Sequence, residues 1–523
     1  MNGSNMHPAP GNKRRPQAKR RGERTEQRYA RLISELRRQF RLGSALQLLE
    51  WDQDTLMPAG ALHERAQQIG TLAVLVHEQQ TTPSFLALVD ELASDIGQLS
   101  SAAAVDVREV KRHLDRERAL GTDLVRARSV LQAEARAAWV DARREDNFAA
   151  LAPYLEQLFA LQREVALAIA PDRDAYDVLV EDHERGATRA SIAQTLQELR
   201  DGLLPLMERL LARLDARPLD ASALCGKFPL DAQRRFNRQV VEALGFDFEH
   251  GRLDEAAHPS TISIGHEVRL TTRYDEGDLR GGLFSSIHEA GHGLYEQAFN
   301  PMVLGTPRGT ACSIGVHESQ SRLWENVVAR SEAFWRYWHP RLGASFPSFP
   351  ECSLDAVVLA VNEARPSLIR VDADEITYNL HIILRFELEC ALLDDSLTVD
   401  SLPGAWEELS KRYLGVAPQS HTEGVLQDIH WASGDIGYFP TYSLGNIYAV
   451  QLWRAAELEI DDLEAQIARG EYSPLVDWLR ENVHLHGQSL TPHALIEAAT
   501  GEPPSVGPLL EYLNRKMTYL ESV

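Results

Sequence analysis

Apolar residues recur every three or four positions along most of the chain, which predicts amphipathic helices. Residues 29–51, YARLISELRRQFRLGSALQLLEW, show this spacing, and later stretches that show it are separated by Pro, Gly or Asp. The sequence contains no fixed-period repeat of the kind that marks a solenoid. We therefore expect a mainly α fold.

One stretch, HPSTISIGHEVRLTTRYDEGD, interrupts the helical spacing. It is rich in β-branched residues, and its runs at 261–264 and 268–274 predict two strands of a small sheet. The helical spacing then resumes and continues to the last residue. Since no linker divides residues 26–523, we expect one large domain there, with two lobes around a cleft.

The first 25 residues differ from the rest because they combine Lys and Arg with Pro and Gly. They lack the apolar run of a secretory signal. We expect a basic, disordered N-terminal arm over residues 1–25. Such an arm can contact nucleic acid or an acidic partner, but a solvated tail is the simpler interpretation.

Charge and composition narrow the class of protein. The net charge of -22 repels nucleic acid and anionic membranes, so neither is an expected partner. The chain is 44% hydrophobic and 25% charged, and no apolar run approaches the roughly 20 residues that span a bilayer. Its four cysteines are far apart and form no CxxC pair, which favours a soluble protein of a reducing, cytoplasmic compartment.

The stretch SSIHEAGHGLYE places two histidines four residues apart, with a glutamate directly after the first. In a helix that begins near Leu283, after a pair of glycines, His288 and His292 lie about 5–6 Å apart on one face, where both can bind one Zn²⁺. Glu289, rotated by about 100°, can instead act as general base on a water that the metal acidifies. On this motif alone, three polar residues that merely share a helix remain the alternative.

A catalytic zinc needs a third protein ligand and an open position. Ala298 stands where the extended form of the motif has a third histidine, and Glu296 lies about 12 Å along the helix from His288. Glu296 is therefore expected to be structural. The next candidate is Glu318, in the helical stretch GVHESQSRLWENVVAR. Arg322 and Glu325 share its face, and we expect them to orient the ligands.

Several separated motifs resemble those of the M32 family of metallocarboxypeptidases, also called the carboxypeptidase Taq family. They are HEAGH, HESQSRLWEN, IRVDADEITYNLHIILRFELE, GVLQDIHW, LLEWDQDTLMP and ATGEPPSVGPLLEYLNRK. The resemblance covers nearly everything after about residue 26. One departure is that the D-x-R-x-T motif of the family begins with Glu267 here, which leaves the role of that residue open, while Arg269 and Thr271 keep their places.

The resemblance implies a large two-lobed helical fold around a deep cleft with a small β-sheet, similar to neurolysin and angiotensin-converting enzymes. It also implies a homodimer with one Zn²⁺, or sometimes Co²⁺, per subunit. His288, His292 and Glu318 would be the ligands. The implied activity is removal of single residues from peptide substrates with a free C-terminus, with broad tolerance for the side chain and poor cleavage near proline.

A carboxypeptidase must recognise a carboxylate, and the bidentate, permanently charged guanidinium of Arg does so well. Arg370 is the candidate, and Asp372, Asp374 and Glu375 follow it as partners that can hold it. A purely structural ion pair is the alternative. By resemblance Arg269 joins Arg370 in substrate binding.

Charge also builds on the scissile oxygen during hydrolysis, so a donor is needed beside the metal. Residues 426–445 offer Gln427, His430, Tyr438 and Tyr442. The resemblance favours His430 and Tyr442 as catalytic residues and Gln427 for substrate binding, whereas Tyr438 is expected to pack. The strand EVRLTTRY is expected to offer an edge for an extended peptide.

Two alternatives remain at this point. An oligopeptidase of similar fold would cut internal bonds and would accept a peptide with an amidated C-terminus. A non-catalytic peptide-binding scaffold would have no chemical need for Glu289, which the sequence retains.

Overall fold

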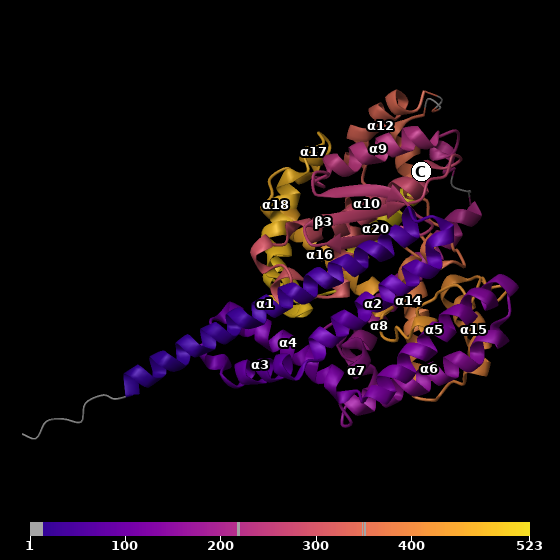
Figure 1. Cartoon of the computed structure of the whole chain (residues 1–523). Helices are drawn as coiled ribbons and strands as arrows, with labels where there is room; N and C mark the ends of the chain where they lie inside the picture. The colour runs from indigo at the N-terminus through magenta and orange to yellow at the C-terminus, as the bar shows by residue number, and fades with distance from the viewer. Residues whose placement is uncertain (1–13, 217–219, 348, 350–351) are drawn as a thin grey trace, which may run out of the picture.

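Helices make up most of the computed structural model, which describes residues 14–216, 220–347, 349 and 352–523 (Figure 1). The helices up to the sheet are α1 (Arg14–Thr55), α2 (Leu62–Thr81), α3 (Pro83–Ser94), α4 (Ser101–Ala119), α5 (Thr122–Glu145), α6 (Phe148–Ile169), α7 (Ala175–Val180), α8 (Arg189–Ala216) and α9 (Leu230–Ala243). Those after it are α10 (Leu279–Ala298), α11 (Ile314–Arg322), α12 (Glu332–Ser345), α13 (Leu354–Val361), α14 (Tyr378–Leu393), α15 (Leu402–Leu414), α16 (Pro440–Glu459), α17 (Leu463–Ile467), α18 (Ser473–Asn482), α19 (Pro492–Thr500) and α20 (Gly507–Ser522). The predicted mainly α fold is confirmed. Within the described ranges, no helix is both long and apolar enough to cross a bilayer.

The small sheet has three strands in the order β1-β3-β2. The two predicted strands correspond to β2 (Ser260–Ile264) and β3 (Glu267–Thr272), which pair antiparallel. The third, β1 (Gly251–Glu255), runs parallel to β3 and was not predicted, because its sequence GRLDE carries a single apolar residue. The expectation that EVRLTTRY offers the sheet edge is wrong, since β3 is central and β2 is an edge.

Helix α10 starts one turn earlier than the sequence indicated. It begins at Leu279, because the side chain of Asp278 accepts a hydrogen bond from the backbone N–H of Arg280 at 2.8 Å and caps the first turn. The paired glycines that were expected to interrupt the helix lie inside it. A capping Asp three residues before the pair was the signal that could have placed the start.

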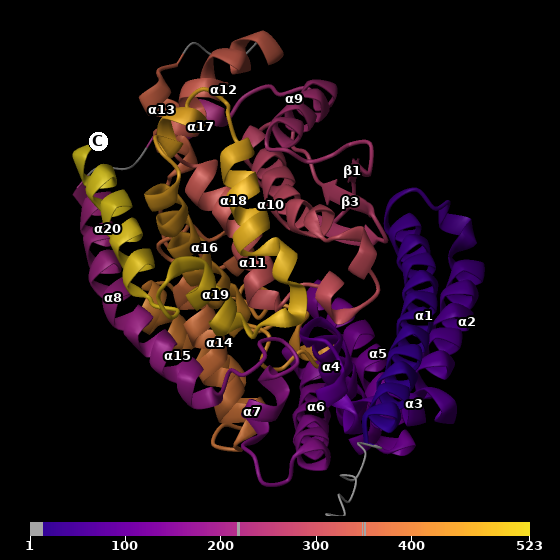
Figure 2. The ribbon, with the colours of Figure 1, turned by 90° about the vertical axis from the view of Figure 1, so that its left-hand side faces the viewer.

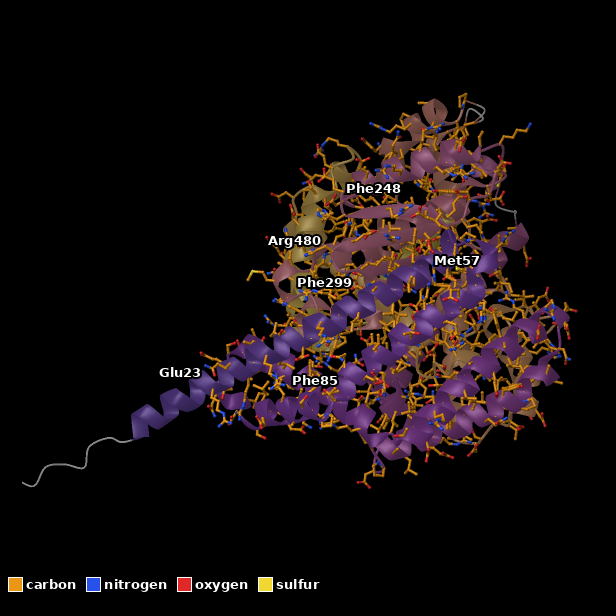
Figure 3. All side chains as sticks on the ribbon, in the orientation of Figure 1. Glu23, Met57, Phe85, Phe248, Phe299 and Arg480 are labelled. Atoms are coloured by element: carbon orange, nitrogen blue, oxygen red, sulfur yellow. The ribbon has the colours of Figure 1, made fainter. Side chains whose placement is uncertain are left out.

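Helix α1 extends into the segment expected to be a disordered arm. It begins at Arg14, so residues 14–25 are helical, while residues 1–13 lie outside the described part of the chain. Arg, Lys and Gln in this segment are good helix formers. The outer end of α1, near Glu23, projects beyond the other helices (Figures 1 and 3).

The N-terminal helices have a small hydrophobic core of their own, separate from the main core. It is made by buried residues of α1, α3 and α4: Leu32, Phe85, Leu88, Val89, Leu92, Val107, Val110 and Leu114. Figure 2 shows α1 and α2 standing to one side of the body. Near its end α1 meets the sheet, where the ring of Trp51 lies 4.1 Å from the guanidinium of Arg269 and 5.0 Å from that of Arg252. The N-terminal helices thus form a distinct flank docked on the sheet.

Candidate metal centre

Three side chains from two helices converge beside the sheet. His288 and His292 lie one turn apart on α10, and Glu318 lies on α11. One ligand atom from each lies within 4.8 Å of the other two, and Glu318 Oε2 is 3.6 Å from His288 Nε2 and 3.5 Å from His292 Nε2. Two ligands of a tetrahedral ion with bonds of about 2.1 Å are about 3.4 Å apart. The set therefore fits a tetrahedral cation.

Two glycines let the helices around this set come into close contact. A Cβ atom on Gly291 would lie 2.6 Å from the backbone oxygen of Gln320, so α10 and α11 meet backbone to backbone. A Cβ atom on Gly445 of α16 would lie 2.6 Å from Cγ of Glu318. The glycine inside HEAGH is thus required by packing, and it sets the distance between the histidine pair and the third ligand.

The ligands are held from behind by charged side chains. Glu325 lies in a π-helical turn, η6 (Leu323–Val328), and its Oε2 is 2.8 Å from His288 Nδ1. Arg322 Nε donates to Glu318 Oε1 at 2.6 Å, and its Nη1 donates to Glu325 Oε2 at 3.3 Å. This arrangement matches the role that the sequence predicted for Arg322 and Glu325. The π turn, a feature often found at functional sites, has no signal in the sequence.

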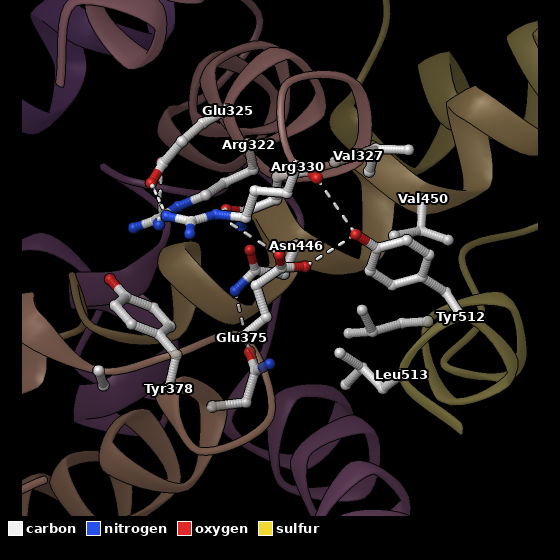
Figure 4. A pocket seen from close by; sticks show the side chains of 15 residues that line it. Arg322, Glu325, Val327, Arg330, Glu375, Tyr378, Asn446, Val450, Tyr512 and Leu513 are labelled. Atoms are coloured by element: carbon white, nitrogen blue, oxygen red, sulfur yellow. Dashed lines mark hydrogen bonds and ion pairs between the residues drawn. The ribbon is translucent and has the colours of Figure 1, made fainter. Parts of the chain in front are cut away.

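The charged network continues from Glu325 to the helix α20. Arg330 Nη2 donates to Glu325 Oε1 at 3.3 Å, and its Nε lies 3.6 Å from Glu375 Oε1. Glu375 also accepts from Tyr512 Oη at 2.9 Å and pairs with Lys516, both on α20. Figure 4 shows Glu325, Arg330, Glu375 and Tyr512 around a small cavity of about 30 Å³, enough for a water molecule.

Opposite charges keep the buried carboxylates of this network ionised. Burial raises the pKa of Glu318, but the charges of Arg322 and His288 outweigh burial and hold that pKa well below its ordinary value. For Glu325, burial is likewise outweighed by Arg322 and by the hydrogen bond with His288, and its pKa falls to about 2. Both carboxylates are therefore anions at neutral pH, the form that binds a cation or orients its ligand.

Glu289 is buried and faces the same cavity as the ligand set. The cavity has a volume of about 570 Å³, and its lining includes all three ligands, Glu289 and Thr261 of β2. Thr261 Oγ1 lies 2.6 Å from Glu289 Oε2, to which it donates. Burial raises the pKa of Glu289, while the charge of His288 and this hydrogen bond oppose the increase.

A second cavity, of about 720 Å³, lies between the N-terminal helices and the first cavity. Arg112, Thr310 and Gln488 line both, so the two cavities form one cleft. Apolar side chains of α1 and α4, among them Phe40 and Val110, line the second. The cleft that the sequence led us to expect is therefore present, and α1 forms one of its walls.

Arg370 is held by a residue other than the three acids expected from the sequence. Its Nε and Nη2 contact Asp428 Oδ1 at 3.0 and 2.8 Å, and its Nη1 donates to Tyr378 Oη at 3.0 Å. Arg385 Nη2 lies 2.5 Å from the other oxygen of Asp428. Asp372, Asp374 and Glu375 make no ion pair with Arg370 among the described residues. The aspartate that does so stands in the quoted motif GVLQDIHW, but its spacing gave no indication of this contact.

Tyr442 and Tyr438 both line the cavity that the three metal ligands face. Tyr438 was expected only to pack, so its place in this lining was not predicted. The ring of Tyr442 lies 4.8 Å from the Arg370 guanidinium, and its Oη lies 3.1 Å from His430 Nε2. His430 itself does not line the cavity. Burial lowers the pKa of His430 to about 4, so its ring is neutral at pH 7.

Arg269 and Gln427 lie away from the cavity lining. Gln427 Oε1 accepts from the backbone N–H of Arg370 at 2.9 Å, and its Nε2 donates to Leu368 O at 3.1 Å. Arg269 Nε donates to Glu267 Oε1 at 2.6 Å, so the glutamate that departs from the family motif still reaches its arginine. In this structure Gln427 accepts a hydrogen bond from the backbone of Arg370, and the guanidinium of Arg269 packs on the ring of Trp51.

Comparison with known proteins agrees with this geometry. Residues 31–517 match the family model described as carboxypeptidase Taq (M32) metallopeptidase. The chain is 42% identical to thermostable carboxypeptidase 1 of Thermus thermophilus, over 95% of this chain and 99% of that protein. It is 36% identical to carboxypeptidase 1 of Bacillus subtilis, over 93% and 97%.

Solved structures give the same result for the fold. The M32 carboxypeptidase from Deinococcus radiodurans superposes with a TM-score of 0.91 at 38% identity, covering 95% of this chain and 100% of that one. Metallocarboxypeptidase 1 of Trypanosoma cruzi superposes with a TM-score of 0.91 at 32% identity, covering 94% and 99%. Together with the metal-binding set on α10 and α11, these matches show that the chain is a metallocarboxypeptidase and belongs to the M32, or carboxypeptidase Taq, family.

Proposed function

We propose that this enzyme removes amino acids one at a time from the free C-terminus of peptides, with broad tolerance for the residue released. The observation that carries the proposal is that His288, His292, Glu318 and Glu289 face one cavity large enough for a peptide end. The relatives from Thermus thermophilus and Bacillus subtilis bear the name carboxypeptidase, which supports the same activity here.

The metal in this proposal is one Zn²⁺ per subunit, with Co²⁺ as a substitute. Two imidazoles and a carboxylate are ligands that suit either ion. When bound, such an ion supplies a Lewis acid that lowers the pKa of a water and polarises the scissile carbonyl.

Glu289 acts as the general base in this proposal. Thr261 occupies Oε2 of its carboxylate, which leaves Oε1 to take the proton of the attacking water. Burial raises the pKa of Glu289 and so makes it a stronger base than a solvated glutamate. The same group can then return the proton to the leaving amine.

Tyr442 serves as the donor to the scissile oxygen, and His430 acts through it. The Nδ1 atom of His430 is buried and has no hydrogen-bond partner among the described residues. Asp428 Oδ1 lies 3.9 Å from this nitrogen, too far for a hydrogen bond, and an unpaired acceptor costs less than an unpaired donor, so we assign the proton to Nε2. This proton is donated to Tyr442 Oη, and the phenolic O–H is then free to point into the cavity.

Arg370 recognises the terminal carboxylate of the substrate. Its three contacts with Asp428 and Tyr378 leave one N–H on each terminal nitrogen without an acceptor in the described part of the chain. Arg370 is buried and does not itself line the cavity, but its guanidinium carbon lies 4.8 Å from the ring centre of Tyr442, which does. The main chain of the substrate would add to the edge strand β2, whose Ser260 and Thr261 line the same cavity.

One assay tests the proposal. A peptide with a free C-terminus and the same peptide with a C-terminal amide are incubated with the enzyme, first with a chelator and then after Zn²⁺ is restored. We expect stepwise release of C-terminal amino acids from the free peptide only, and only with metal. Internal fragments from both peptides would instead identify an oligopeptidase, and no release from either would identify a binding protein.

We also propose a cytoplasmic homodimer. All four cysteines are free, which supports a reducing compartment. Helix α2 buries none of its side chains, and Leu62 and Val74 on it are 55% and 57% exposed. A second subunit covering α2 would account for these exposed side chains, and sedimentation velocity of the purified protein tests the assembly.

A further inference from the structure

A third histidine touches the ligand set without belonging to it. His317 precedes Glu318 on α11, and its Nδ1 lies 2.5 Å from Nδ1 of His292. Its other ring nitrogen, Nε2, lies 2.9 Å from Oε1 of Glu296 on α10. The imidazole of His317 therefore lies between two side chains of the neighbouring helix that are one turn apart.

Only one arrangement of protons satisfies all of these contacts while His292 binds a cation. His292 must present the lone pair of Nε2 to the ion, which places its proton on Nδ1. The Nδ1 atom of His317 must then accept this proton in a hydrogen bond, so the proton of His317 is on Nε2. That N–H in turn donates to the carboxylate of Glu296.

We propose that His317 and Glu296 form a positioning pair that fixes the tautomer and the ring orientation of the ligand His292. The inference rests on the metal-binding role of His292 and goes beyond the proposed catalytic residues. Metal-binding histidines commonly donate their second N–H to a carboxylate or carbonyl, and removal of that partner weakens metal binding. Here the carboxylate acts through a second imidazole.

The two ligand histidines are thereby supported in different ways. His288 contacts the carboxylate of Glu325 directly, at 2.8 Å, whereas His292 reaches Glu296 only through His317. The rings of His292 and His317 are 4.5 Å apart between centroids, and the ring of Tyr295, also on α10, lies 5.4 Å from that of His317. Packing therefore holds His317 in place, and Glu296, which was expected to be structural, orients it.

Metal affinity of four variants tests the pair. The dissociation constant for Zn²⁺ is measured by competition with a chelating indicator for His317→Phe, Glu296→Leu and Glu296→Gln. The control, His250→Phe, removes a histidine that pairs with Asp247 on the surface, outside the cavity. We expect His317→Phe and Glu296→Leu to weaken Zn²⁺ binding by about 10–100-fold. Glu296→Gln keeps an acceptor oxygen and should stay within about threefold of the wild type, as should the control.

Two further readouts separate positioning from other roles. The visible spectrum of the Co²⁺-loaded protein should shift in His317→Phe and Glu296→Leu but not in Glu296→Gln. His317 also lines the cavity, but Glu296 does not, so the peptide KM of Glu296→Leu should change less than its metal affinity. Thermal unfolding of the metal-free proteins checks the fold. If His317→Phe does not fold, the difference in Zn²⁺ affinity between Glu296→Leu and Glu296→Gln tests the proposal.

The proposal is overturned if Zn²⁺ binds His317→Phe and Glu296→Leu within about threefold of the wild type, or if both variants change only KM. Because metal binding is measured without peptide, a wild-type protein that binds Zn²⁺ but releases no amino acid contradicts the proposed function and leaves this inference standing.

Discussion

Glu289 differs from the metal ligands in the contact it makes. Its carboxylate is bonded to a hydroxyl of the edge strand and not to another charge of the ligand set. We predict that Glu289→Gln keeps Zn²⁺ and loses peptide turnover by about 10²–10⁴-fold, because the amide cannot accept the proton of the attacking water.

Metal content by atomic absorption and amino-acid release from a free-carboxylate peptide check this prediction. Glu249→Gln, a change at an exposed glutamate, serves as the control. Turnover within tenfold of the wild type would rule out Glu289 as the base.

Arg370 is buried and pairs with Asp428 at 2.8 Å. The partner Asp428 stays paired with Arg385 when Arg370 is removed, so the fold should survive the change. We predict that Arg370→Ala lowers kcat/KM by about 10–100-fold, the value of a hydrogen bond between charged groups.

The specific test uses competition by a free amino acid and by its amide. The wild type should prefer the free amino acid, and Arg370→Ala should lose that preference. Equal weakening of both ligands would assign Arg370 a purely structural role with Asp428.

At the residue scale, the sequence was sufficient for the ligands and insufficient for the side chains that support them. His288 and His292 follow from motif spacing, Glu318 was a candidate that the family resemblance singled out, and the structure brings the three together. The contacts of Asp428 and His317 could not be predicted. They join segments that are far apart in the chain or on different helices, and spacing within one helix carries no information about them.

At the scale of elements, the contact between α10 and α11 depends on one glycine. Gly291→Ala would place a methyl group 2.6 Å from Gln320 O and force the two helices apart. We predict a lower melting temperature and weaker Zn²⁺ binding, since His292 and Glu318 lie on opposite sides of this contact.

Gly281→Ala in the same helix is the matched control, because a Cβ atom there has no neighbour within 4 Å. It should raise stability by roughly 0.5–1 kcal/mol through helix propensity. Thermal unfolding and a Zn²⁺ titration measure both variants. Equal melting temperatures and equal Zn²⁺ affinities for the two variants would show that the close contact between α10 and α11 limits neither stability nor metal binding.

Helix α14 contributes a buried acid to the loop that carries Tyr438. Glu389 accepts from Trp431 Nε1 at 2.9 Å, from Tyr176 Oη at 3.1 Å and from Gly437 N at 3.3 Å. Burial raises the pKa of Glu389 from 4.5 to about 8, although the hydrogen bonds oppose the increase. The carboxyl group is therefore protonated in the folded protein at neutral pH.

A raised pKa makes stability depend on pH in a defined direction. The folded state binds this proton more tightly than the unfolded state, so the contribution of Glu389 is complete below pH 4.5 and is lost as pH rises toward about 8. The loss is about 1.4 kcal/mol per pH unit at most. We predict that Glu389→Gln flattens this part of the profile, as measured by melting temperature between pH 5 and 9 relative to the wild type. Parallel profiles would contradict the assignment.

At the scale of the whole molecule, Trp51 and Arg269 join the N-terminal flank to the sheet. Their contact of 4.1 Å lies on β3, next to the strand that carries Thr261. We predict that Arg269→Leu speeds hydrogen exchange in α1 while Zn²⁺ affinity stays unchanged, because the cation–π contact is lost and no ligand moves.

The control is Arg41→Leu, because Arg41 lies on α1, as Trp51 does, but takes no part in this contact. If Arg269→Leu raises peptide KM and leaves exchange in α1 unaltered, then Arg269 binds substrate, as the family resemblance implied.

The overall architecture was predictable where it depends on local periodicity. The helices and two of the strands follow from apolar spacing. The parallel strand β1, the separate N-terminal core and the joining of two cavities into one cleft depend on contacts between distant segments. The GRLDE sequence of β1 also lacks the alternation that marks a strand.

The charged network behind His288 has a consequence for biosynthesis. Its last members, Tyr512 and Lys516, lie on α20, far downstream of the ligands in the chain. While a ribosome is still making the protein, the ligands have emerged and can meet, but the carboxylate of Glu375 has not yet received its partners from α20. A nascent chain should therefore hold its metal loosely, and peptidase activity should begin only after α20 has left the exit tunnel.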